Sequence, residues 1–251
     1  MTVEIPLVLL AAFGAGLIDA MAGGGGLIQV PALFAAFPTT AHTTLLGTGK
    51  LAGFAGTASA AMRYVRHVRL DARLVGAAAG GAFVSAIAGA WIATRFPPAQ
   101  FRALVPVLLT VVLAYTLVHK DLGRTHAPRG GLLLAAGTAG AIGLYDGFFG
   151  PGTGSFLVFL FIRVFGLDFL HASASAKVVN CAANVAALLL FGFTVKLMWL
   201  LGFGMALANV VGAQVGSHLA IRGGSAFVRK VFLGVVSCLI AKTAWDAHLF
   251  W

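Results

Sequence analysis

Charged residues are scarce in this chain, and acidic residues are the scarcest of them. Only 10% of the 251 residues are charged, and Asp and Glu together number seven. A water-soluble domain needs a mainly polar exterior, which a chain with 60% hydrophobic residues cannot supply. The composition therefore excludes an ordinary soluble enzyme or binding domain and predicts a membrane protein.

Cysteine is almost as rare, with Cys181 and Cys238 both in apolar segments. Neither has a Cys or His partner at the spacing of a zinc site, so both are expected to be small packing residues. The chain also lacks the HExxH, GKS/T and Ser/His/Asp patterns that mark common enzymes. We therefore expect no metal, no cofactor and no catalytic residue.

Apolar runs of membrane-spanning length are abundant. Ile5–Ala22, Leu74–Thr94 and Ala103–Val118 contain few or no charges. Each approaches the ~20 residues that an α-helix needs to cross ~30 Å of hydrocarbon. The predicted fold class is an all-α polytopic membrane protein. The first run lacks a basic region before it, so we expect a retained helix rather than a signal peptide.

The basic residues gather in two connectors and give a net charge of +10. The first connector holds Arg63, Arg66, Arg69 and Arg73, and the second holds Lys120, Arg124 and Arg129. Basic clusters between spans are cytoplasmic anchors under the positive-inside rule. Their expected partner is the anionic surface of the lipid bilayer, not nucleic acid.

An internal repeat organises the chain. Asp19 precedes the glycine run 23–26, and Asp146 precedes the run 150–154. The interval from Asp19 to Asp146 is the same as the interval from Lys50 to Lys177. Because charges are so rare here, this match indicates a true duplication, and we call the shared interval the repeat offset. We predict a first transmembrane repeat at 1–118, a cytoplasmic linker at 119–130 and a second repeat at 131–251.

Each repeat is predicted to contain the same series of helices. One helix runs into the glycine break, a short apolar helix follows, and then come a lysine-bearing helix and two more spans. The ranges are 5–22, 27–37, 43–65, 70–94 and 102–118 in the first repeat, and 132–149, 155–165, 172–193, 196–220 and 227–248 in the second.

The number of crossings decides how the repeats are related. With five crossings in each half, the second repeat is inverted and most basic residues face the cytoplasm. If the short helix is re-entrant, each half has four crossings and the repeats are parallel. That places Arg222, Arg229 and Lys230 outside, against the charge bias. Inverted repeats are therefore favoured, with glycine-broken helices meeting at the midplane.

The glycine breaks are candidate anion-binding turns. Non-helical backbone at membrane depth occurs where protein buries it or where it lines a cavity. In transporters such breaks expose helix N-termini whose partial positive charge faces an anionic group. The candidate residues are Gly24, Gly25, Gly26, Gly152, Thr153, Gly154 and Ser155. The alternative is that the glycines only allow close packing at a kink.

The two lysines are the second part of the candidate site. A lysine within an apolar helix is costly and usually faces an interior pathway. Asn180 and Asn184 lie on the same helix face as Lys177, so they are expected to line that pathway too. Lys50 and Lys177 would then bind a substrate anion. The alternative is that each lysine snorkels to an interface or forms a purely structural ion pair.

Asp19 and Asp146 have two possible roles. They stand directly before the breaks in strongly apolar helix, with no basic neighbour in sequence. One role is to hold the lysines in place, and the other is to take up and release protons during transport. Structural pairing is the simpler expectation.

Some small and polar residues suggest contacts between helices. Asn209 and Gln214 are expected either to line the pathway or to form hydrogen bonds between helices. Two glycine pairs have the spacing of small-xxx-small packing: Gly76 with Gly80, and Gly212 with Gly216. Faces of this kind leave room for a homodimer.

Three segments carry a resemblance to a known family. They are LIDAMAGGGGL at 17–27, YDGFFGPGTGSF at 145–156 and AKVVN at 176–180. In these segments, and over nearly its whole length, the chain resembles the TauE/SafE family of membrane permeases. The resemblance implies a multi-pass permease of the bacterial inner membrane. It also implies a sulfur-containing anion as substrate, such as sulfite, sulfoacetate or another organosulfonate.

Taken together, the residues and the resemblance predict a secondary transporter that exports a small sulfur-containing anion by alternating access. Proton coupling through the aspartates is one option. The alternatives are an anion channel-like pore and an intramembrane enzyme that uses the buried aspartates. The lack of any nucleophile–base or metal-ligand spacing argues against the enzyme.

Overall fold

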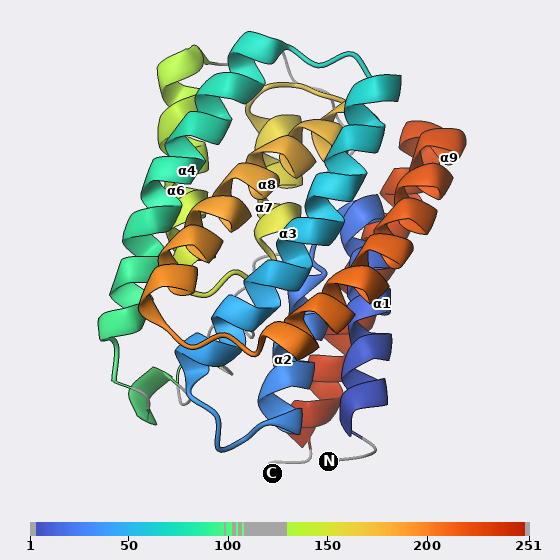
Figure 1. Cartoon of the computed structure of the whole chain (residues 1–251). Coiled ribbons are helices and arrows are strands. Elements are labelled where there is room, and N and C mark those ends of the chain that lie inside the picture. The colour runs from blue at the N-terminus through green and yellow to red at the C-terminus, as the bar shows by residue number, and fades with distance from the viewer. Residues whose placement is uncertain (1–3, 98, 102–103, 105–106, 108–129, 249–251) are drawn as a thin grey trace.

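A computed structural model describes residues 4–97, 99–101, 104, 107 and 130–248, and its regular structure in these ranges is entirely α-helical (Figure 1). The helices are α1 (Glu4–Ala22), α2 (Gly26–Ala36), α3 (His42–His67), α4 (Ala72–Arg95), α6 (Leu132–Phe148), α7 (Thr153–Arg163), α8 (Phe169–Thr194) and α9 (Trp199–His248). Most of the predicted helix at 102–118 and nearly all of the predicted linker at 119–130 lie outside the described residues.

Four of the described helices are long and apolar enough to cross a membrane: α1, α4, α8 and the part of α9 up to Val231. The apolar helices α2, α6 and α7 are shorter. Large hydrophobic side chains such as Leu133 and Leu200, each 90% exposed, cover the outside of the molecule, as expected for a surface that faces lipid. The chain is therefore a multi-pass α-helical membrane protein.

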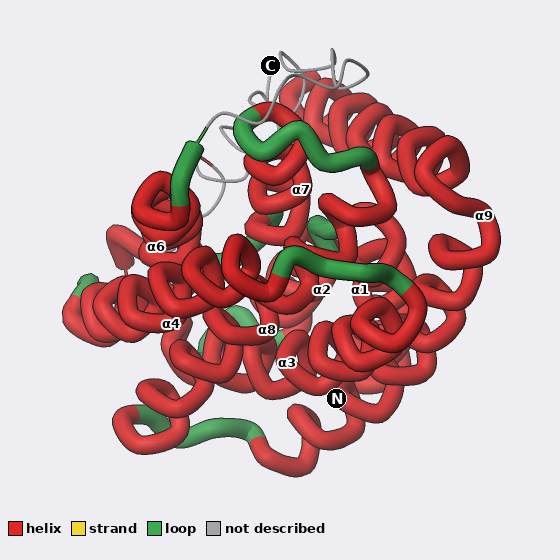
Figure 2. Tube along the Cα trace, turned by 90° about the horizontal axis from the view of Figure 1, so that it is seen from above, coloured by secondary structure: helices red, strands yellow, loops and turns green. Residues whose placement is uncertain are grey.

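The helices form two outer groups around a central one. Figure 2 shows α4 and α6 on one side, α1 and α9 on the other, and α3 and α8 between them. The lysine-bearing helices α3 and α8 pack against each other and run in opposite directions. Their antiparallel course brings Thr48, near the start of α3, beside the connector after α8, where its Oγ accepts the Met198 N–H at 3.1 Å.

Glycines allow the outer helices to touch backbone to backbone. A Cβ built on Gly81 of α4 would lie 2.1 Å from the Ala136 carbonyl oxygen of α6, and one on Gly212 of α9 would lie 2.1 Å from the Phe13 carbonyl oxygen of α1. The predicted small-residue contact of Gly212 therefore exists. A Cβ on Gly76 or Gly80 would meet nothing within 4 Å among the described residues, so these two glycines make no such contact between the described helices.

These close contacts recur at the repeat offset. Gly16 on α1 faces the carbonyl oxygen of Asn209 on α9. Gly143 on α6 is the repeat equivalent of Gly16, and it faces the carbonyl oxygen of Ala82 on α4, which is the repeat equivalent of Asn209. In the same way, Gly216 faces Leu17 and Gly89 faces Leu144.

The short helices α2 and α7 fold back along the helices that precede them. Leu33 of α2 packs in one hydrophobic cluster with Val8 and Ala12 from the first half of α1. In Figure 1 the chain thus returns to the end from which α1 starts before α3 begins. Both reversals need glycine in the left-handed region, with φ of 79° at Gly23 and 98° at Gly150.

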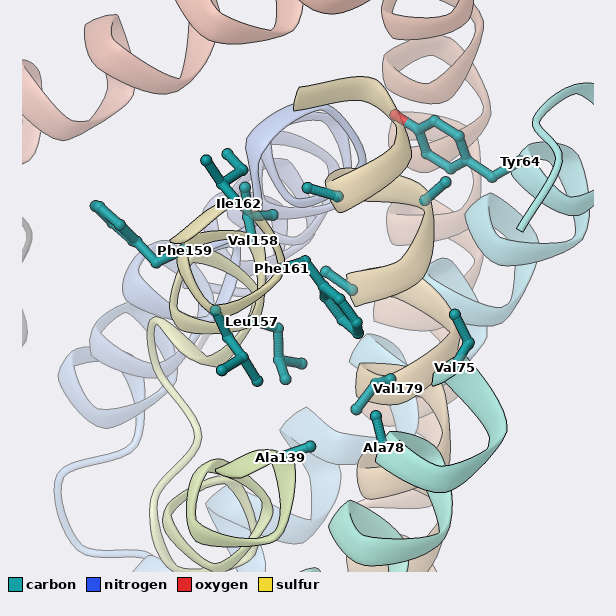
Figure 3. Packing of buried hydrophobic residues seen from close by; sticks show 14 of the residues in the cluster. Tyr64, Val75, Ala78, Ala139, Leu157, Val158, Phe159, Phe161, Ile162 and Val179 are labelled. Atoms are coloured by element: carbon teal, nitrogen blue, oxygen red, sulfur yellow. The ribbon is translucent and has the colours of Figure 1, made fainter. Parts of the chain in front are cut away.

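The helix α7 forms much of the protein core. Nine of its eleven residues are buried. Figure 3 shows Phe161 of α7 pointing toward Val179 of α8 and Val75 of α4. Because α7 is surrounded by other helices, its N-terminal end at the glycine break has a fixed position.

The last two predicted spans, 196–220 and 227–248, correspond to the two helical parts of α9, which meet at a kink with non-helical backbone at Gly224. Gly224 has φ 64°, a conformation that favours glycine. The turn lies beside the start of α8, where Ser225 Oγ donates a hydrogen bond to Asp168 and accepts one from the Leu170 N–H.

Candidate functional site

The two glycine breaks pack directly on each other. A Cβ on Gly23 would lie 2.4 Å from the Gly154 carbonyl carbon, and one on Gly26 would lie 3.1 Å from Pro151 Cα. Only residues without side chains permit this approach. The packing brings the N-terminal ends of α2 and α7 to one place between α1, α3, α6 and α8.

Neither of these helix ends is capped by the side chain of its own N-cap residue, although the Asp19 carboxylate accepts the Gly25 N–H at the start of α2. The N-cap residues are Gly25 for α2 and Gly152 for α7, which have no side chain to offer. The first N–H groups of a helix have no partner within it and carry partial positive charge. Two such ends at one point therefore favour a negatively charged group.

Two ion pairs cross the site. Lys50 Nζ lies 2.6 Å from Asp146 Oδ2, and Lys177 Nζ lies 3.0 Å from Asp19 Oδ2. Each pair joins a lysine from one predicted repeat to the aspartate of the other. Lys177 is fully buried, Asp146 is 1% exposed and Lys50 is 7% exposed. The alternative in which the lysines snorkel to an interface is thus wrong.

Amide and hydroxyl groups extend the two pairs differently. Lys50 Nζ also donates to Asn184 Oδ1 at 3.1 Å, and Asn184 Nδ2 lies 3.3 Å from Asn180 Oδ1. On the other side, Asp19 accepts from Thr57 Oγ1 and from the Gly25 N–H, both at 3.4 Å. Lys50 therefore has amide neighbours, whereas the additional partners of the second pair are on the carboxylate.

A cavity of about 60 Å³ lies at the centre of this arrangement. Most of the predicted site residues line it: Asp19, Gly24, Gly25, Gly26, Lys50, Asp146, Gly152, Thr153, Gly154, Asn180 and Asn184. Val30, Leu46 and Phe149 add apolar walls. The fold thus brings together residues from both halves of the sequence around one small polar space.

Two predicted site residues do not line the cavity. Lys177 is fully buried and is bonded to Asp19, which itself borders the cavity. Ser155 is buried at the start of α7, where a Cβ on Gly24 would lie 3.2 Å from its Oγ. Both residues support the wall of the site from behind.

Sequence reasoning missed Gln29 and left the role of Asn209 open. Both line the cavity, and Asn209 Nδ2 donates to Gln29 Oε1 at 3.0 Å. Gln29 Nε2 donates in turn to the Gly49 carbonyl oxygen at 2.8 Å. Gln29 is the only polar side chain between Leu27 and Phe37, and that isolation was the available signal.

A second polar cluster lies between α3 and α9. Arg63 donates to the side chain of Gln214 at 2.7 Å and lies 3.2 Å from His218 Nδ1, and Gln214 bonds to Ser59. A separate cavity of about 300 Å³ borders Arg63, Arg66 and His67. Gln214 therefore connects helices, which is one of its two predicted roles, and does not border the central cavity.

The described ranges contain no group of three His, Cys, Asp or Glu side chains that could hold a metal ion. Cys181 is partly buried and is a free cysteine. The chemistry available at the central site is therefore that of lysines, carboxylates, amides and helix ends.

Comparison with known proteins places this geometry in a family. The family model for the sulfite exporter TauE/SafE matches residues 8–243. The probable membrane transporter protein YfcA of Escherichia coli (strain K12) is 35% identical over 238 residues, which are 93% of this chain and 87% of that protein. The probable membrane transporter protein ORF9 of Sinorhizobium sp is 37% identical over 241 residues, which are 94% and 90% of the two chains.

A probable membrane transporter protein of Haemophilus influenzae is 31% identical over 240 residues, covering 95% of this chain and 93% of that protein. No solved structure matches the chain. The family and the relatives describe a membrane transporter and not an enzyme. With the match to the family model spanning nearly the whole sequence, the chain belongs to the sulfite exporter TauE/SafE family.

Proposed function

We propose that the protein is a secondary transporter that exports a small sulfur-containing anion, and that the anion binds to Lys50 in the central cavity. The single observation behind this proposal is the position of Lys50. Its ammonium group lies at a cavity that two helix N-termini with glycine N-caps also border. Charge-assisted hydrogen bonds from an ammonium and from backbone N–H groups are what an oxyanion requires.

The size of the cavity favours the smaller candidates in this conformation. At about 60 Å³ the cavity is small. Sulfite is closer to that size than sulfoacetate or taurine, both of which carry a carbon chain. A longer organosulfonate would require the helices around the cavity to move apart.

Alternating access would follow from an inverted pair of repeats, which we propose as the architecture. The glycine contacts that recur at the repeat offset support a two-fold relation between the halves. The opposite courses of α3 and α8 in Figure 1 support an inversion. In carriers of this kind, one repeat rocks against the other around a substrate site near the midplane.

Replacement of Lys50 tests the proposal. In proteoliposomes, we expect the wild-type protein to carry sulfite with saturable kinetics, and we expect Lys50→Ala to lose most of the flux and of the sulfite affinity. Loss of one charge-assisted hydrogen bond at ~1.5–3 kcal/mol corresponds to a tenfold to hundredfold weaker affinity. Sulfoacetate, taurine and sulfate should be assayed alongside sulfite.

Lys196→Ala is the matched control, because Lys196 is exposed and lies in the connector between α8 and α9. It should leave sulfite affinity unchanged. Wild-type affinity in Lys50→Ala would remove the basis of the proposal. Flux that never saturates with sulfite concentration would favour a channel-like pore instead.

A further inference from the structure

We infer that Asp146 binds a proton when an anion occupies the cavity, so that the proton is a co-substrate, while its counterpart Asp19 stays ionised and structural. This inference rests on the proposed function, because it concerns how the same site accepts its anion. Three features of the site support it: the balance of its side-chain charges, the different hydrogen-bond partners of the two aspartates, and the position of Lys50.

The charges at the cavity already balance. Among the residues that the structure describes, Asp19, Lys50 and Asp146 are the ionisable side chains that line it, and Lys177 lies directly behind Asp19. Two ammonium groups therefore face two carboxylates. A monovalent anion would add one negative charge that no side chain balances, and only the partial positive charges of the two helix N-termini would offset it. One proton taken up by the site removes that excess.

Lys50 is the lysine that an anion can reach. It lines the cavity, whereas Lys177 is fully buried and does not. An anion that accepts hydrogen bonds from Lys50 Nζ competes with Asp146, which now holds that group at 2.6 Å. Within the described ranges, Lys50 is the one hydrogen-bond partner of the Asp146 side chain. Asp146 thus loses its counter-charge when the anion binds.

Asp19 keeps its hydrogen-bond partners when the anion binds. It is held by Lys177, Thr57 and the Gly25 N–H, none of which involves Lys50. A carboxylate with an ammonium partner and two further hydrogen bonds has little reason to take a proton. The two aspartates occupy equivalent positions in the repeat, but only Asp146 depends on the lysine that serves the substrate.

No other ionisable group in the described ranges can replace Lys50 as a partner of Asp146. Tyr145 is next in sequence, but its hydroxyl donates to the Pro151 carbonyl oxygen. The helices α4 and α7 carry their charges at their ends, as Arg73, Arg95 and Arg163, and α2 carries none. On α8, Lys177 is engaged with Asp19, and Asp168 and His171 lie at its start.

The step balances in charge and atoms. The anion accepts hydrogen bonds from the Lys50 ammonium, which keeps its protons, and the released Asp146 carboxylate forms an O–H bond with one proton. Anion and proton leave together on the other side, and Asp146 then pairs with Lys50 again. Transport of a monovalent anion is therefore electroneutral, with one proton moving in the same direction as each anion. Export is then driven by the concentration gradient of the anion itself, because a proton gradient that is acidic outside would drive this pair inward.

Proton uptake on anion binding is the direct test. We would titrate the purified wild-type protein in detergent with methanesulfonate, a monovalent sulfonate whose own charge does not change near neutral pH, and follow a pH-indicator dye in weak buffer. We expect about one proton taken up for each anion bound. Binding without proton uptake would overturn the inference and leave the proposed function intact. Failure of both methanesulfonate and sulfite to bind would overturn the proposed function itself.

Flux in proteoliposomes gives the second test. For the wild type, an acidic exterior should drive net uptake of methanesulfonate, and an imposed membrane potential should have little effect. Asp146→Asn leaves one extra positive charge at the cavity, so its flux should lose the pH-driven component at least tenfold and become sensitive to potential. The double variant Asp19→Asn with Lys177→Met removes the other ion pair. It should keep the wild-type ratio of pH-driven flux to basal flux. If the double variant loses the pH-driven flux and Asp146→Asn keeps it, the roles of the two aspartates are the reverse of those inferred.

Discussion

At the scale of single residues, one substitution between the repeats separates the roles of the two lysines. Asn184 in the second predicted repeat and Thr57 in the first are separated by the repeat offset, so the two would occupy equivalent positions. Asn184 Oδ1 accepts a hydrogen bond from Lys50, whereas the shorter Thr57 donates to Asp19. The amide therefore helps to hold Lys50 at the cavity, and the hydroxyl instead stabilises the carboxylate of the other pair.

We expect Asn184→Ala to weaken sulfite binding while the protein stays folded. Loss of one hydrogen bond to a charged group, at ~1.5–3 kcal/mol, corresponds to an affinity at least about tenfold lower. Binding to purified protein by isothermal titration calorimetry measures this. Cys181→Ala on the same helix is the control, because Cys181 does not line the cavity. Equal affinities of the two variants would contradict the role given to Asn184.

Asp168 links stability to pH at the start of α8, just outside the span. Burial, the largest single influence on its carboxyl group, raises the pKa, but hydrogen bonds from Ser225 and His171 together outweigh it. The folded-state pKa therefore lies below the ordinary value of 3.8. A lowered pKa stabilises the fold above the unfolded value, and that stabilisation is lost as pH falls through the folded value.

We therefore expect Asp168→Ala to unfold at a lower temperature than the wild type at pH 7, and the gap to narrow as pH falls below 3.8. Thermal unfolding in detergent at several pH values measures this difference in unfolding temperature. Asp71→Ala is the control, since Asp71 caps α4 through the N–H groups of Arg73 and Leu74. Loss of a cap alone costs ~1 kcal/mol, and Asp168→Ala should cost more. A gap that stays constant with pH would contradict this assignment.

At the scale of helices, the contact between α4 and α6 depends on which glycine faces the partner. We expect Gly81→Ala to destabilise the protein by ~1–3 kcal/mol, because its Cβ would meet the Ala136 carbonyl oxygen at 2.1 Å and force the helices apart. Gly80→Ala should be neutral or stabilising by up to ~1 kcal/mol, since a Cβ there meets nothing within 4 Å. Thermal unfolding of the two variants compares them directly. Equal stability would show that the helices are not in tight contact.

The order and approximate ranges of the helices could be predicted from the sequence, because apolar runs and glycine breaks mark them. The predicted break between residues 220 and 227 corresponds to the turn at Gly224. Which glycines pack could not be predicted: Gly76 and Gly80 share the spacing of Gly212 and Gly216 but have no neighbour within reach of a Cβ among the described residues. Spacing places residues on one face, and only tertiary structure decides what that face meets.

Most of the cavity-lining residues could also be predicted, since Asp19, Lys50 and Asp146 stand out in apolar sequence. The unequal access of the two lysines to the cavity could not be predicted. Their sequence surroundings are alike, and the difference comes from Asn184 and Thr57 across the site. Gln29 was missed because no equivalent polar residue marks its place in the second repeat, where Phe156 stands. Partners that lie so far apart in the sequence cannot be assigned by spacing.

At the scale of the whole molecule, the crossed ion pairs connect the two halves. We expect Lys177→Met to destabilise the protein by up to ~3–5 kcal/mol, because it leaves the carboxylate of Asp19, whose side chain is 16% exposed, without its counter-charge. Adding Asp19→Asn should restore much of the loss, since a neutral pair has no charge to compensate. Thermal unfolding of the single and double variants in detergent gives the coupling free energy between Lys177 and Asp19. Additive losses would mean that the pair does not act as a unit.

The crossed pairs also have a consequence for how the protein is made. Lys50 finds Asp146 only after 96 further residues have been synthesised, and Asp19 finds Lys177 only after 158. At ~5–20 residues per second, these groups wait roughly 5–30 s inside or beside the bilayer without their final partners. The first half of a nascent chain thus holds Asp19 and Lys50 in a different pairing until the second half inserts. Ribosome pausing or truncation within that interval would leave a product suited to recognition by membrane quality control.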